Sequence, residues 1–189
     1  MSEALVTLSR GRSGGFTAIE LLVVLTLIAI FMVLALPSFD STIKRYRVST
    51  AASEIGSVLQ FARAEAIRTR TNVTVKKTAT PDAGCADSGG ATDWRCGIAV
   101  FAADDNTTSI KTISAVDLKG LKVNSSAESI VYAPLGFVYQ GGEDSTIFVG
   151  PSADGDTPAT SPYASYVCFG AGGRINVVSG STGCSPNAN

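Results

Sequence analysis

An apolar run near the amino terminus limits the structures open to this 189-residue chain. Between Leu21 and Leu36 the sequence contains no charged residue, and Thr26 is the single side chain with a hydroxyl. As an α-helix that rises about 1.5 Å per residue, residues 16–36 would measure about 30 Å, the thickness of a bilayer's hydrocarbon core. The run therefore predicts a helix that can span a membrane.

Glu20 is the unusual residue of this segment, because it places an acid a few positions into the apolar helix. An ionised carboxylate at the centre of a membrane costs about 2.5–3.5 kcal/mol unless it finds a partner. A carboxylate buried between packed helices needs a cation. The position of Glu20 therefore indicates a function rather than a contribution to stability.

A Gly15-Phe16 junction is followed by Thr17, Ile19, Glu20 and Leu21, and Pro37 ends the apolar run. This pattern resembles the class III leader of type IV pilins and type II secretion pseudopilins, except that Ala18 stands where the family more often has Leu. The resemblance implies that a prepilin peptidase cuts between Gly15 and Phe16 and that the new amine of Phe16 is methylated. It also implies that Glu20 pairs with this amine on a neighbouring subunit, since an α-amine has a pKa near 8 and is cationic at neutral pH.

Two other interpretations of the apolar run are an uncut signal anchor and a signal peptide cleaved after Ala35. Neither explains Glu20, and a run of about 16 residues exceeds the usual signal-peptide core of 7–15. Basic residues flank the run on both sides, so charge gives no orientation. The resemblance implies a single-pass protein of the bacterial inner membrane with its globular part in the periplasm, which later enters a pilus or pseudopilus.

After Pro37 the apolar residues follow a spacing of 3.5 to 3.6, with charged residues between them, so we expect the helix to continue in amphipathic form. The residues of this predicted apolar face are Phe39, Ile43, Val48, Ala51, Ala52, Ile55, Val58, Leu59, Ala62, Ala66 and Ile67. Pro37 removes a backbone donor and predicts a bend. The predicted organisation is a leader (1–15), a transmembrane half of the helix (16–37), an amphipathic half (38–71) and a globular β domain (72–189).

Nine short segments rich in β-branched and aromatic residues, each bounded by turn residues, predict antiparallel strands. They are residues 72–77, 97–101, 109–113, 121–123, 129–133, 136–140, 146–150, 164–169 and 174–178. The predicted fold class is α+β, with a long N-terminal helix packed on an antiparallel β domain, as in type IV pilins.

Four cysteines, all beyond the apolar run, indicate disulfides in an exported chain. They are Cys85, Cys96, Cys168 and Cys184. Three pairings are possible, and the short polar loops favour Cys85 with Cys96 and Cys168 with Cys184. Zinc is disfavoured because the sequence has no His and no CxxC pair.

The sequence shows no candidate active site, so we expect neither an enzyme nor a cofactor. The commonest general base is missing, because the chain has no His. The acids Asp104, Asp105, Glu143 and Asp144 stand among turn residues and fit solvated turns. The Gly172-Gly173 pair lacks a following helix, which argues against a phosphate-binding loop.

The whole chain resembles the GspH/FimT group of minor pilins and pseudopilins. The stretch LQFARAEA at 59–66 resembles a helix end that recurs in this group, and Gly173-Arg174-Ile175 resembles its closing segment. The resemblance implies a FimU/FimT-like minor pilin of a type IV pilus tip or initiation complex, whose partners are other pilin subunits. The alternative is a GspH-type pseudopilin of a type II secretion system.

A second alternative is a FimT-type pilin that binds DNA. Members of that type are associated with a Gly-Arg-x-Arg motif, and Gly173 and Arg174 match it, but Asn176 stands where the second Arg belongs. Residues 71–189 hold seven basic and eleven acidic residues, with Lys76, Lys77 and Arg95 as candidate helpers. This charge balance disfavours DNA as a partner.

Overall fold

The computed structural model describes residues 15–78, 85, 90–102, 107–115, 117–141, 145–152, 161–180 and 183–184. The chain divides into two compact units, Met1–Ser41 and Thr42–Asn189. The leader residues 1–14 and the acids Asp104, Asp105, Glu143 and Asp144 lie outside the described residues.

One helix, α1 (Ala18–Thr69), contributes residues to both units. Thr17 precedes it, and its hydroxyl accepts a hydrogen bond of 3.3 Å from the backbone N–H of Glu20, as an N-cap residue does. The helix is continuous through residue 37, and the bend at Pro37 stays a prediction. Within the part of the chain that the structure describes, no helix combines the length and the hydropathy of a membrane span.

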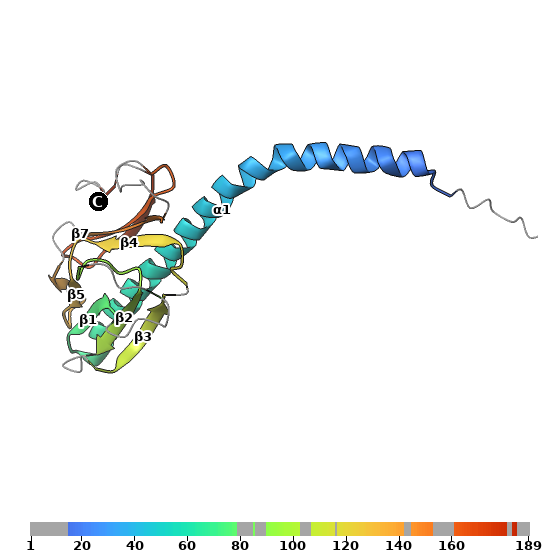
Figure 1. Ribbon diagram of the computed structural model, residues 1–189. Helices are drawn as coiled ribbons and strands as arrows, with labels where there is room; N and C mark the ends of the chain where they lie inside the picture. Colours follow the sequence, from blue (N-terminus) through green and yellow to red (C-terminus); the bar gives the residue numbers. More distant parts are fainter. Residues whose placement is uncertain are drawn as a thin grey trace, which may run out of the picture. The chain divides into compact units, whose positions relative to one another are not determined.

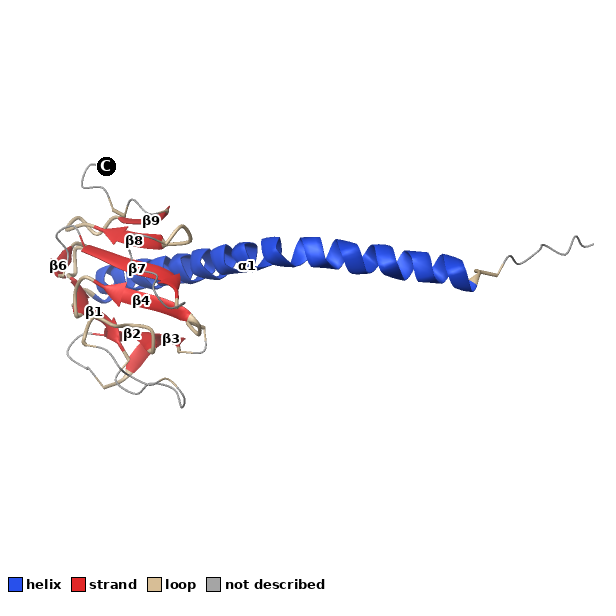
Figure 2. Ribbon diagram, turned by 45° about the horizontal axis from the view of Figure 1, so that its top comes forward, coloured by secondary structure: helices blue, strands red, loops and turns tan. Residues whose placement is uncertain are grey.

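The nine strands form two antiparallel sheets in the second unit (Figures 1 and 2). They are β1 (Val73–Lys77), β2 (Gly97–Ala102), β3 (Ser109–Ser114), β4 (Leu121–Ser125), β5 (Ser129–Tyr132), β6 (Val138–Gln140), β7 (Ser145–Pro151), β8 (Ser165–Phe169) and β9 (Ile175–Ser179). One sheet has the order β3-β2-β1-β5-β6, and the other has the order β4-β7-β8-β9. The predicted α+β fold class is confirmed, and the predicted strand bounds differ from these by no more than two residues.

One apolar core joins the helix to both sheets. From α1 it takes Val48, Ala51, Ala52, Ile55, Val58, Leu59, Ala62 and Ala66, which follow the helical spacing of three and four. Four of these eight are alanines, whose small side chains let the helix approach the strands closely. The predicted apolar face also included Phe39, Ile43 and Ile67, but the structure leaves these three exposed.

Two disulfides lie in the β domain, between Cys85 and Cys96 and between Cys168 and Cys184. This is the pairing that the sequence analysis favours, because each bridge closes a short polar loop. The first ties the segment before β2 to residue 85, and the second ties β8 to the residues after β9. In each bridge the two Cα atoms are 5.6 Å apart, which is within the usual range.

Candidate functional site

The apolar start of α1 carries the residues predicted to direct assembly. Phe16 lies just before the helix and is 82% exposed. Every residue from 15 to 32 is exposed, including the twelve large apolar side chains of this stretch. Among the described residues of the first unit, α1 is the single element, so this surface has no other element to pack against within that unit.

Glu20 lies in the first turn of α1 and is exposed. The partial positive charge of a helix N-terminus favours an acid at this position. Thr17 and Glu20 also fit the Thr-x-x-Glu pattern of a capping box, a local signal that the sequence interpretation overlooked. Among the described residues, no Lys or Arg forms an ion pair with Glu20. Its carboxylate is thus open to a cation from outside this chain.

Arg63, in the second half of α1, joins the helix to the turn between β8 and β9. Its guanidinium donates a hydrogen bond of 2.8 Å to the carbonyl oxygen of Gly173 and one of 3.3 Å to that of Gly172. The planar fork of Arg suits two acceptors at once. Arg63 is therefore a clamp between the helix and this turn, rather than a member of a solvated helix face.

Two glycines allow the turns beside Arg63 to pack closely against each other. Gly173 has a φ of +74°, and a Cβ there would overlap the carbonyl oxygen of Gly136. Gly136, in the turn between β5 and β6, has a φ of +80°, and a Cβ there would come within 2.7 Å of Ile67. L-residues with side chains rarely adopt such φ values. The Gly-Arg-Ile motif thus has a structural reason for its glycine: the two turns touch beside Arg63.

Tyr132 of β5 is fully buried close to the same clamp. Burial raises the pKa of its phenol, and the charge of Arg63 opposes that rise. In the described part of the chain, neither the Tyr132 hydroxyl nor Nε of Arg63 has a hydrogen-bond partner. These two buried polar atoms lie beside the apolar core, and no local sequence pattern predicts that they come close to each other.

Comparison with known families settles the group to which this fold belongs. The sequence model described as "Type II transport protein GspH" matches residues 51–181. The chain belongs to the GspH family. The match includes the clamp residues Arg63, Gly136 and Gly173, and it begins after the apolar start of α1.

Two crystal structures of the type IV minor pilin FimU from Pseudomonas aeruginosa PAO1 share the fold of this GspH-family chain. One has 17% sequence identity and a TM-score of 0.54, and it covers 71% of this chain and 90% of FimU. The other has 18% identity and a TM-score of 0.50, with 69% and 91% covered. A comparison with curated protein sequences found no match. The chain is a minor pilin or pseudopilin, and such proteins are structural, non-enzymatic subunits.

Arg174, the residue considered for DNA contact, is exposed and directly precedes β9. The cations proposed to help it lie on other elements of the GspH-family fold. Lys76 lies on β1 of the other sheet, 4.6 Å above the ring of Phe101. Arg95 forms an ion pair of 2.6 Å with Asp93. The described residues therefore do not gather these cations into one phosphate-binding surface.

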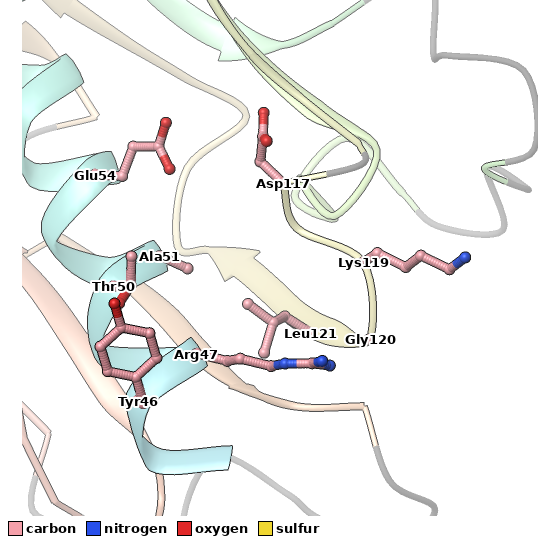
Figure 3. Close-up of a pocket in the computed structure, with 9 residues that line it drawn as sticks. All are labelled: Tyr46, Arg47, Thr50, Ala51, Glu54, Asp117, Lys119, Gly120 and Leu121. Atoms are coloured by element: carbon pink, nitrogen blue, oxygen red, sulfur yellow. The ribbon is translucent and has the colours of Figure 1, made fainter. Parts of the chain in front are cut away.

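A pocket of about 600 Å³ lies between α1 and the loop before β4 (Figure 3). Its lining is Tyr46, Arg47, Thr50, Ala51, Glu54, Asp117, Lys119, Gly120 and Leu121. Charges of both signs are present, and Asp117 accepts hydrogen bonds from the backbone and hydroxyl of Ser114 at 3.2 and 2.7 Å. No nucleophile among the lining residues is hydrogen-bonded to a base, so the pocket gives no support to catalysis. The described residues also contain no cluster of three potential metal ligands.

Proposed function

We propose that this chain is a FimU-like minor pilin that enters the tip or initiation complex of a type IV pilus. Cleavage between Gly15 and Phe16 by a prepilin peptidase exposes the amine of Phe16, which is then methylated. Before assembly the chain is held in the bacterial inner membrane by residues 16–37, with its β domain in the periplasm. Likeness to the FimU fold and the leader motif support this role.

The observation that carries the proposal is the exposure of every residue from 15 to 32, with Glu20 in the first turn. Burying one large apolar side chain stabilises a structure by about 1.5–3 kcal/mol. Twelve such side chains on one helix therefore favour either lipid or the helices of neighbouring subunits. Burial of these side chains therefore drives association of the helix with lipid or with neighbouring subunits, while Glu20 sets the axial offset between neighbouring helices.

The axial offset between neighbouring helices follows from the energetic cost of burying a charge without a partner. Once neighbouring helices surround Glu20, its carboxylate is costly unless a cation lies opposite. The amine of Phe16 on the next subunit meets this need at one axial offset between the helices. Pairs of this kind are best attested as devices that fix the register of helices.

The test is Glu20→Ala in cells that assemble pili, with Glu65→Ala on the same helix as the matched control. We expect Glu20→Ala to be cleaved and membrane-bound, but to be incorporated into pili at least tenfold less than the parent chain. Glu65→Ala should be incorporated normally, because the carboxylate of Glu65 already has a cation in Arg68 of its own helix. Normal incorporation of Glu20→Ala would refute the register role.

The second candidate is a minor pseudopilin of a type II secretion system. It is favoured by the family model, which is described as a type II transport protein. The two candidates share the leader, the fold and the clamp, so deletion of the gene separates them. Loss of pili with normal secretion supports the minor pilin, whereas loss of secretion with normal pili supports the pseudopilin.

A further inference from the structure

Four exposed apolar or aromatic side chains gather where α1 ends. They are Ile67 of α1, Leu135 and Phe137 of the turn between β5 and β6, and Tyr139 of β6, and together we call them the helix-end patch. Leu135 is 83% exposed and Tyr139 is 72% exposed. Single exposed apolar residues are common, but a contiguous group marks an interaction site.

One contact, between Gly136 and Ile67, brings the two elements of the patch together. Gly136 packs against Ile67, and Leu135 and Phe137 flank Gly136 in the chain. Phe137 and Tyr139 are two residues apart, a spacing that places side chains on one face of an extended segment. Figure 2 shows β6 beside the end of α1.

The turn that presents Leu135 is held in place. The N–H of Gly136 donates to the carbonyl of Ala133 at 2.8 Å, and the N–H of Ala133 donates to the carbonyl of Phe137 at 2.9 Å. The Arg63 clamp lies directly beneath, because Gly136 also touches Gly173. A surface that is already ordered loses little conformational entropy when a partner binds.

The charges around the patch are cationic. Arg70 directly follows the end of α1. Arg174 directly follows Gly173, which lies against Gly136 in the turn between β5 and β6. Both arginines are exposed. The acid in the last two turns of α1 is Glu65, which is bonded to Arg68. The surroundings of the patch thus carry positive charge, although residues 71–189 as a whole have four more acids than bases.

We propose that the helix-end patch binds the globular domain of a different subunit in the same assembly, through an apolar surface bordered by carboxylates. The proposal rests on the proposed assembly function and adds the partner's chemistry. A face-to-face contact with a second copy would bring the arginines against each other. The phosphates of DNA would pair with the arginines, but the apolar centre of the patch would then have no partner. Tyr and Arg beside apolar residues are typical of the side chains that dominate binding energy at protein interfaces.

The test is site-specific photo-crosslinking of the full chain in cells that assemble it. A benzophenone amino acid replaces Leu135, and the control replaces Ile110, an exposed apolar residue on the edge strand β3. We expect an adduct with another subunit from position 135 at a yield at least fivefold above that from position 110. Mass spectrometry should place Asp or Glu beside the crosslinked partner residue.

Charge reversal then tests the border of the patch. Arg174→Glu should lower the yield at position 135 at least fivefold, and reversal of the nearest partner carboxylate to Lys should restore it. Equal yields at positions 135 and 110, adducts with a second copy, adducts with DNA, or no adduct from position 135 would each overturn the proposal. If the chain is absent from filaments but crosslinks to another subunit, the pilus role fails and the patch proposal stands.

Discussion

The two ends of helix α1 carry the same kinds of apolar side chain but differ in what covers them. Residues 15–32 are exposed throughout, whereas the apolar residues between Val48 and Ala66 are buried in the core of the β domain. Leu25 is 57% exposed and Leu59 is 1% exposed, although both are leucines of one helix. Composition alone therefore does not decide whether a helix is covered by its own chain.

The distribution of apolar residues around the helix axis explains why one half of α1 is exposed and the other is buried. From Val48 onward the buried positions lie on one stripe, with charged and polar residues on the opposite side, so two sheets suffice to cover them. Before residue 33 the apolar side chains surround the helix on all sides, which is typical of a helix enclosed by lipid or by several neighbours. The first half thus depends on its environment, and the second half depends on its own domain.

The largest expected effect comes from removing one apolar side chain from each half. Ile55→Ala should lower the free energy of unfolding of the β domain by about 2–5 kcal/mol, because Ile55 is 1% exposed and its loss leaves a cavity. Leu25→Ala should leave this free energy unchanged. Urea denaturation of the full chain in detergent, followed by near-UV circular dichroism, measures both. A similar loss of stability in the two variants would break the distinction between the halves.

Removal of the clamp should have a smaller effect on the second half. Arg63→Ala leaves the carbonyls of Gly172 and Gly173 without their donor, and we expect a loss of about 2–3 kcal/mol. Arg63→Lys should recover part of it, since an ammonium group cannot reproduce the fork. Arg68→Ala is the control, because that side chain is bonded to Glu65 on the surface. If Arg63→Ala unfolds at the same urea concentration as Arg68→Ala, the clamp does not stabilise the fold.

The smallest expected effect at neutral pH comes from Tyr132→Phe. The Tyr132 hydroxyl has no partner among the described residues, so its loss should change stability by less than about 1 kcal/mol at pH 7. Burial raises the pKa of Tyr132 above its usual value of 10. The unfolded chain therefore releases this proton at a lower pH than the folded chain does, and stability falls as the pH rises above 10.

The variant removes that loss, so its alkaline unfolding midpoint should lie at a higher pH than that of the parent chain. Tyr139→Phe, at an exposed position, is the matched control and should leave the midpoint unchanged. Fast alkaline unfolding followed by circular dichroism gives the midpoints. An unchanged midpoint in Tyr132→Phe would show that ionisation of this phenol does not limit stability.

Much of the fold follows from local sequence patterns. The helical spacing after Pro37 and the short β-branched segments predict α1 and all nine strands, because burial on one face leaves a period in the sequence. The exposed ends of the predicted apolar stripe, such as Phe39 and Ile67, could not be recognised in this way. Their exposure depends on how far the sheets extend along the helix, which is a property of the folded chain.

The candidate site was predictable to a lesser degree. Glu20 stands out because an acid in an apolar run conflicts with its surroundings, and that conflict is visible in the sequence. The hydrogen bond from Arg63 to Gly173 joins residues 110 positions apart, so no local sequence pattern predicts it. Tyr132 was missed for the same reason, since its burial beside Arg63 arises from the packing of separate elements.

The mass of the mature chain isolated from native filaments tests the central claim most directly. If the exposed apolar helix begins at a processed amine that meets Glu20 of a neighbour, the chain will begin at Phe16 and carry one additional methyl group. A chain that begins at Met1, or one that begins at Leu36 after loss of the whole apolar segment, would contradict the claim.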